Sequence, residues 1–192
     1  MAGGGGHHAY PDHGEGFCLL NDIAVGIKKM QKEGRVRKAA VVDLDAHQGN
    51  GTAAVFRDSP EIFTFSMHNS EAYPEIKEKS SLDIPLRPET GDEDYLGLLS
   101  EHLPSALEKH APGLVVYVAG ADCHETDLLG GLAMTFEGLK KRDEFVFSQC
   151  FKMKIPVAVV LAGGYLKNPA DTVAVHAQTI ETALVVFGVR PA

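Results

Sequence analysis

The sequence predicts one α/β domain over residues 1–192, in which a mainly parallel sheet lies between layers of helices, a three-layer α/β/α architecture. Three continuous apolar runs, at 39–45, 114–119 and 157–162, are typical of strands that are buried on both faces. Helical patterns separate these runs, and such alternation of strands and helices indicates a parallel sheet. A length of 192 residues suits a single domain with a substantial core.

In the first half of the chain, apolar residues recur at helical spacing from Phe17 to Met30, and Gly34 is expected to end this helix. The apolar strand at 39–45 follows. A further run at 62–67 is shorter and alternates more, and it predicts a fourth strand.

In the second half, Thr90-Gly-Asp-Glu93 has the pattern of a capping box at a helix start. Pro104 is expected to kink or end that helix. Another helix is predicted over about 136–152. The last helix is bracketed by Asn168, an N-cap residue followed by proline, and by Gly188 as a stop signal.

Composition excludes several functional classes. The net charge of −8 argues against direct nucleic-acid binding through bulk electrostatics, and a cationic guest suits the chain better. Three distant cysteines without a C-x-x-C motif argue against a disulfide framework. The chain has no apolar run of transmembrane length and no signal-peptide pattern, so no membrane partner is expected and the predicted location is intracellular, cytoplasmic or nuclear.

The most informative stretch follows the strand at 39–45, where Asp43, Asp45 and His47 alternate ahead of a glycine-rich turn. Residues two apart on a strand share a face, so these side chains converge at the carboxyl end of the strand, where open α/β sheets bind ligands. Asp45 and His47 are two plausible ligands of a metal site. Spacing alone leaves five candidates for a third in the loop after the next strand, namely Asp122, Cys123, His124, Glu125 and Asp127.

These residues resemble the zinc-dependent histone deacetylase superfamily, which has the arginase/deacetylase fold. The matching segments are Gly4-Gly-Gly-His-His8, Gly16-Phe-Cys18 with Asn21-Asp22, Asp43-Leu-Asp-Ala-His47, Ala119-Gly-Ala-Asp122 with Asp127, and Gly163-Gly-Tyr165. The run from Asp43 to Gly51, the Asp127–Leu132 segment and Lys141-Arg-Asp-Glu144 are most similar to the class IV branch. The resemblance implies removal of acetyl or other acyl groups from lysine side chains, or from an amine such as a polyamine.

The resemblance assigns one catalytic zinc ion to Asp45, His47 and Asp127. Two oxygens and one nitrogen also suit iron(II). The resemblance further implies a structural monovalent cation, K⁺ or Na⁺, at a group that shares two of these ligands. That group comprises Asp43, Asp45, His47, Ser66 and Met67.

For catalysis, the resemblance makes His8 the general base, which takes a proton from the attacking water and later protonates the leaving amine. His7 is the neighbouring imidazole. Asp43 is expected behind His7 and Asn50 behind His8, where an amide stabilises an imidazolium less than a carboxylate does. Tyr165 is expected to donate its hydroxyl to the oxyanion.

Three further residues, Gly16, Phe17 and Tyr73, are expected to line a narrow apolar channel for the substrate side chain. Asp-Ala-His would also suit a binuclear manganese ureohydrolase, but the tandem histidines and Gly-Gly-Tyr165 speak against that reading.

Family members have a long segment before the tandem histidines, so the domain is expected to be truncated at its N-terminus. Family topology then predicts the strand order 39–45, 157–162, 114–119, 62–67. The first strand would be an open edge with unpaired backbone groups, either because the chain is a fragment or because another chain supplies the missing strand. Because the histidines would hang from a free end, we expect weak zinc binding by this chain alone. A non-catalytic fragment that acts by binding is the alternative.

Overall fold

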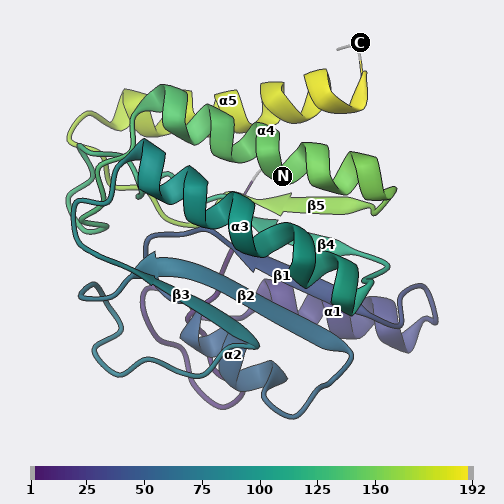
Figure 1. Ribbon diagram of the computed structural model, residues 1–192. Helices are drawn as coiled ribbons and strands as arrows, with labels where there is room; N and C mark the ends of the chain where they lie inside the picture. The colour runs from purple at the N-terminus through teal and green to yellow at the C-terminus, as the bar shows by residue number, and fades with distance from the viewer. Residues whose placement is uncertain (1–2, 190–192) are drawn as a thin grey trace.

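The computed structural model describes residues 3–189 and contains a five-stranded parallel sheet in the order β3-β2-β1-β4-β5 (Figure 1). In chain order the elements are α1 (Asp22–Lys32), β1 (Ala39–Asp43), α2 (Asn50–Phe56), β2 (Ile62–Asn69), β3 (Leu82–Leu86), α3 (Asp92–His110), β4 (Val115–Val118), α4 (Phe136–Met153), β5 (Val157–Val160) and α5 (Pro169–Phe187).

Helices cover both faces of the sheet, so the predicted three-layer α/β/α architecture is confirmed. One face carries α3, α4 and α5, and the other carries α1 and α2 (Figure 1). Within β1, Ala40 and Val42 belong to the first core cluster, whereas Ala39 and Val41 belong to the second. Alternate side chains of a strand point to opposite faces, so burial on both faces requires the continuous apolar run seen in the sequence.

The register of the sheet decides which loops meet at its carboxyl edge. Asp43, the last residue of β1, pairs with Ser66 on β2 and with Val118 on β4. The loops that leave β1 and β4 therefore start side by side. Polar residues that follow Asp43 and Val118 at similar offsets are brought together at this edge, as expected for parallel α/β sheets.

The predicted strands are confirmed, but their predicted order is wrong. Strand β1 lies in the middle of the sheet with all five residues buried, so it is not the open edge. The two outer strands are β3 and β5, and β5 is largely half-exposed. Strand β3 was missed because it contains Asp83 and Pro85, and proline is confined to edge strands or bulges. A partner chain is therefore not expected at 39–45.

Two of the predicted helices keep their predicted bounds to within a residue. Helix α4 begins at Phe136, and α5 follows Asn168, whose side chain accepts a hydrogen bond from the Ala170 N–H at 3.2 Å. Gly188 ends α5 in the left-handed conformation, with φ of 65°. These ends follow from local capping chemistry, which the sequence carries directly.

The starts of α1 and α3 differ from the prediction. Helix α1 begins at Asp22 instead of Phe17, because Asn21 caps it by accepting the Ala24 N–H at 2.9 Å. At α3 the N-cap residue is Gly91, which has no side chain to make a capping bond. The helix continues past Pro104 to His110, so the proline does not end it.

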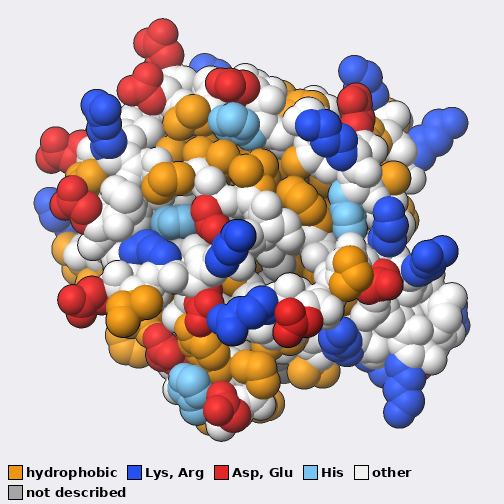
Figure 2. Space-filling model, turned by 60° about the horizontal axis from the view of Figure 1, so that its bottom comes forward, with side chains coloured by type: hydrophobic (Ala, Val, Ile, Leu, Met, Phe, Trp, Pro, Cys, Tyr) orange, Lys and Arg blue, Asp and Glu red, His pale blue; other side chains and the backbone are white. Residues whose placement is uncertain are grey.

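The surface of the molecule carries both signs of charge. Figure 2 shows one face, on which acidic and basic side chains are interspersed with apolar ones. Among residues 3–189, no helix combines the length and the apolar character that crossing a membrane requires.

Candidate metal and catalytic site

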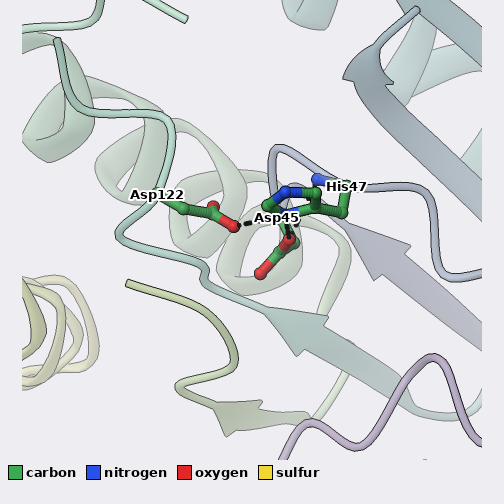
Figure 3. Close-up of side chains that lie close together, drawn as sticks. All are labelled: Asp45, His47 and Asp122. Atoms are coloured by element: carbon green, nitrogen blue, oxygen red, sulfur yellow. Dashed lines mark hydrogen bonds and ion pairs between the residues drawn. The ribbon is translucent and has the colours of Figure 1, made fainter. Parts of the chain in front are cut away.

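Three side chains converge at the carboxyl edge of the sheet (Figure 3). Asp45 and His47 come from the loop after β1, and Asp122 comes from the loop after β4. One ligand atom of each lies within 4.8 Å of the other two. His47 Nδ1 is 3.1 Å from Asp45 Oδ1 and 2.9 Å from Asp122 Oδ2. We call these three residues the metal group.

Backbone N–H groups hold the two carboxylates of the metal group in place. Asp122 Oδ1 accepts from the Ala46 N–H at 2.9 Å, and Asp45 Oδ2 accepts from the Gly163 N–H at 2.9 Å. A Cβ atom on Gly163 would lie 2.6 Å from Asp122 Oδ2, so only glycine lets this backbone approach so closely. The loop after β5 thus forms one wall of the group.

The structure brings Asp122, and not the predicted third ligand Asp127, into the metal group. Both oxygens of Asp127 already bond to backbone: Oδ1 accepts from the Leu129 and Gly130 N–H groups at 2.8 Å, and Oδ2 accepts from the Tyr165 N–H at 2.6 Å. Asp127 therefore ties the loop after β4 to the loop that carries Tyr165.

The charges within the metal group are strongly coupled. Burial would lower the pKa of the His47 imidazole, but its hydrogen bonds to Asp122 and Asp45 raise the pKa to about 11. Burial and the charge of Asp45 raise the pKa of Asp122 to about 7. Burial would also raise the pKa of Asp45, but the imidazoles of His7 and His47 hold it well below its usual range. A cation at this position is favoured by two converging carboxylates, and a metal ion would have to displace the His47 proton.

The tandem histidines lie beside the metal group, and each has the predicted partner. His7 Nδ1 is 2.8 Å from Asp43 Oδ2, and His8 Nδ1 is 2.7 Å from Asn50 Oδ1. The two rings lie 4.1 Å apart between centroids, and His7 Nε2 is 3.8 Å from Asp45 Oδ1. Both histidines are buried, at 3% and 6% exposure.

The two imidazoles have opposite proton affinities. Burial would lower the pKa of His7, but the carboxylates of Asp43 and Asp45 raise it to about 9. Burial and the neighbouring His7 lower the pKa of His8 to about 4. At neutral pH His8 is therefore the neutral ring, which can accept a proton.

The segment that carries the tandem histidines is held from several sides, although it begins close to the N-terminus. Asp22 Oδ1 accepts from the Gly6 N–H at 2.7 Å, and the His7 carbonyl accepts from the Thr52 N–H at 2.9 Å. Asn21 Nδ2 donates to Thr52 Oγ1 at 3.1 Å. The expectation that these histidines hang loosely is wrong. Asp22 and Thr52 received no role from the sequence, because their contacts depend on how α1 and α2 pack.

A cavity of about 920 Å³ opens above these side chains, and the predicted channel residues line it. Phe17, Tyr73 and Tyr165 are 89%, 40% and 50% exposed. The ring of Tyr73 lies 5.0 Å from that of His8, and the ring of Phe17 lies 6.1 Å from that of Tyr165. At Gly16, a Cβ would lie 2.4 Å from His8 Cδ2, so glycine is required for the wall to approach the His8 ring.

The group predicted to bind a monovalent cation lies at the end of β1, in the loop that follows it, and on β2. Asp43 and Ser66 are paired across these strands, and Met67 is buried beside them. Ser66 Oγ lies 2.9 Å from His68 Nδ1, which occupies part of its hydrogen-bonding capacity. A monovalent cation here stays a prediction.

The residues of the metal group fit a catalytic zinc site. Such sites have three protein ligands, which are often imidazole and carboxylate groups, and one position that stays open for water or substrate. Here two carboxylates and one imidazole converge, and all three residues line the cavity. The metal group is therefore accessible to a substrate from the cavity.

Comparisons with known proteins agree with this geometry. An uncharacterised protein of Picosynechococcus sp. is 47% identical over 173 residues, which cover 90% of this chain and 58% of that protein. Histone deacetylase 2 of Arabidopsis thaliana is 35% identical over 175 residues, which cover 90% of this chain and 45% of the relative. The chain spans about half the length of these relatives.

A solved structure shares the fold. The HD domain of HDA15 matches with a TM-score of 0.78 and 27% identity, over 97% of this chain and 55% of that one. The sheet and its helices therefore form an arginase/deacetylase-like fold. Membership of class IV stays a prediction. The family model for the histone deacetylase domain matches residues 1–180, and the chain belongs to this family.

Proposed function

We propose that the protein is a zinc-dependent amidohydrolase that removes acetyl or other acyl groups from lysine side chains. The observation that carries this proposal is the pair of buried imidazoles, one of which lies 3.8 Å from a carboxylate of the three-ligand metal group, at the base of a cavity with aromatic walls. Relatives named histone deacetylases support it.

Asp45, His47 and Asp122 would hold one zinc ion. When bound, the ion acts as a Lewis acid that polarises the amide carbonyl and makes water more acidic. The two carboxylates are already oriented by backbone N–H groups, so they need little reorganisation to bind it. The monovalent cation, K⁺ or Na⁺, would bind behind this group at Asp43 and Ser66, where it would have a structural role.

His8 would act as the general base and then as the general acid. Its Nδ1 is bonded to Asn50, and Nε2 has no hydrogen-bond partner within residues 3–189, so Nε2 can accept a proton from the attacking water. Because the pKa of His8 is lowered to about 4, the imidazolium that forms readily gives its proton to the leaving amine. His7, bonded to Asp43, would stay protonated and supply positive charge beside the developing oxyanion.

Tyr165 would donate its hydroxyl to that oxyanion, and Phe17 and Tyr73 would hold the alkyl chain of the substrate. Tyr165 follows Gly163 and Gly164, and its backbone N–H is tied to Asp127. Tyr165 is 50% exposed and lines the cavity, so its phenol would be available to a substrate.

The test is hydrolysis of an acetyl-lysine peptide by the zinc-loaded protein, with an acetylated polyamine assayed in parallel. We expect peptide turnover that is lost on chelation and falls about 10²–10⁴-fold in His8→Ala and about 10²–10³-fold in Tyr165→Phe. The exposed Asp58→Ala serves as a control that should not change it. Turnover that survives both active-site changes would refute the mechanism. Turnover of the polyamine alone would refute the lysine substrate.

A further inference from the structure

A hydrogen-bonded network at the lip of the cavity reaches the tandem histidines through Glu15. Its Oε1 accepts hydrogen bonds from the Tyr73 hydroxyl and from Asn50 Nδ2, the latter at 3.2 Å. Its Oε2 lies 3.2 Å from His13 Nε2. Reciprocal backbone hydrogen bonds between Glu15 and Cys18, at 3.0 and 2.7 Å, close the turn that places this carboxylate.

The two ends of the buried Asn50 amide meet different partners. Oδ1 lies 2.7 Å from His8 Nδ1, whereas Nδ2 donates to Glu15 Oε1 and, at 3.3 Å, to the Tyr10 hydroxyl. A carboxylate only accepts hydrogen bonds. The Tyr10 hydroxyl donates its own proton to Glu78 Oε1 at 3.3 Å, so it too accepts from Asn50. Both contacts require the amide nitrogen at this end and leave the oxygen facing His8.

This orientation of Asn50 determines which nitrogen of His8 carries the proton. Oδ1 is an acceptor, so Nδ1 must be the protonated nitrogen and the neutral ring keeps its lone pair on Nε2. Nε2 is the nitrogen without a hydrogen-bond partner within residues 3–189, and His8 lines the cavity. The nitrogen that can act as a base is therefore the one that remains open.

The neighbouring dyad does not need such help. Asp43 presents an acceptor to His7 Nδ1 whichever of its oxygens faces the ring. The amide of Asn50 can turn over, and Nδ2 would then face His8 Nδ1. That arrangement would place the ring proton on Nε2, where the ring could no longer accept one. The carboxylate of Glu15 opposes the turned-over amide, because it would then face the amide oxygen.

We propose that Glu15 is a positioning residue that acts through Asn50 to keep His8 in the tautomer with an unprotonated Nε2. The same carboxylate oxygen holds the hydroxyl of Tyr73, so one residue links the wall of the cavity to the general base. The catalytic consequence rests on the proposed function, whereas the tautomer can be measured without turnover.

The first experiment compares the wild-type protein with Glu15→Ala by two-bond ¹⁵N–¹H correlation spectra of the histidine rings, in the zinc-loaded protein at pH 7.5. The His8 signals are assigned from their loss in His8→Ala. We expect the Nδ1–H tautomer in the wild type. In Glu15→Ala we expect a mixture that contains the Nε2–H form, and a loss of kcat of at least about 10-fold.

The second experiment tests whether a carboxylate at position 50 can replace the one removed at position 15. In the Glu15→Ala background, Asn50→Asp places beside His8 a carboxylate that specifies the tautomer without any outside acceptor. We expect this double variant to recover the Nδ1–H tautomer and most of the lost kcat. In the wild-type background the same Asn50→Asp change is expected to be harmful, because two carboxylates would face each other across the 3.2 Å contact.

Two single changes separate the roles of the Glu15 contacts. Tyr73→Phe removes the hydroxyl that bonds to Glu15 and should raise KM with kcat and the His8 tautomer unchanged. His13→Gln removes the exposed partner of Glu15 Oε2 and should change neither kcat nor the His8 tautomer. Glu15→Gln keeps the shape of the side chain and should lie between the wild type and Glu15→Ala, which guards against misfolding of the alanine variant.

Two outcomes would overturn the proposal: an unchanged His8 tautomer in folded Glu15→Ala, or a double variant that regains neither the tautomer nor kcat. A wild-type protein that shows the Nδ1–H tautomer, loses it in Glu15→Ala and yet hydrolyses no acyl-lysine would refute the proposed function and support the role of Glu15.

Discussion

The floor and the rim of the cavity are built in different ways. The floor consists of the metal group with His7 and His8, and every polar side chain there makes at least one hydrogen bond within the protein. The rim consists of Phe17, Tyr73 and Tyr165, which are 40–89% exposed. We therefore expect changes in the floor to affect the chemical step and changes in the rim to affect substrate binding. Substitutions in the floor should therefore lower zinc affinity or kcat, whereas substitutions in the rim should mainly raise KM.

The largest effect is expected in the floor, where zinc affinity distinguishes Asp122 from Asp127 as the third ligand. We expect Asp122→Asn to weaken zinc binding by more than about 100-fold, because it removes a direct ligand, and partners outside the ligand set alone cost 10–100-fold. Asp127→Asn should leave zinc affinity within a few-fold, since both oxygens of Asp127 bond to backbone. Isothermal titration with zinc measures both. The reverse ranking would restore Asp127 as the ligand.

Asp122 was within reach of the sequence, although spacing in one loop did not select it. In the sheet, Asp43 pairs with Val118, so His47 and Asp122 each lie four residues beyond a paired position. The two side chains are therefore neighbours, whereas Asp127 is carried past them. Matching the offsets of the two strand ends would have favoured Asp122, but only if β1 and β4 were known to be adjacent.

That adjacency is what local patterns do not encode. The periods and capping residues in the sequence predict α4 and α5 well, because they act within one element. Strand order depends on contacts between segments that are far apart in the sequence. In the structure these contacts place β1 in the centre of the sheet. The supports of the floor, such as Asp22, Thr52 and Glu15, likewise depend on contacts between distant segments.

The coupled charges of the floor should make zinc affinity depend on pH. Zinc must displace the proton on His47, whose pKa is raised to about 11, and below about pH 7 also a proton on Asp122. Because protons compete with the metal, zinc affinity should rise with pH, by about 10-fold for each unit between pH 7 and 9 and more steeply below pH 7. Titrations in two buffers of different ionisation enthalpy would measure the released protons. Affinity independent of pH would contradict the coupled charges of the floor.

The support beneath the tandem histidines gives a smaller effect. Asp22→Ala would leave the N–H groups of Gly5 and Gly6 without their carboxylate partner, at a cost of about 1–3 kcal/mol. We expect faster hydrogen exchange at His7 and His8 and a roughly 10-fold lower kcat. Zinc affinity should stay within a few-fold, because Asp22 does not contact the metal group. Asp58→Ala, an exposed aspartate elsewhere, is the matched control. Equal exchange in both variants would show that the segment is held without Asp22.

The smallest effect is expected at the rim, where a change at Phe17 should weaken substrate binding and leave stability nearly unchanged. Phe17 has a positive φ of 65°, a conformation that costs a residue with a side chain about 1–2 kcal/mol, and its ring is 89% exposed. Phe17→Gly relieves that strain but makes the unfolded chain more flexible, so the free energy of unfolding should stay within about 1 kcal/mol of wild type. The lost ring contact should raise KM about 3–10-fold with kcat nearly unchanged. A large fall in stability would show that Phe17 packs as part of the fold, and a fall in kcat would place it with the floor.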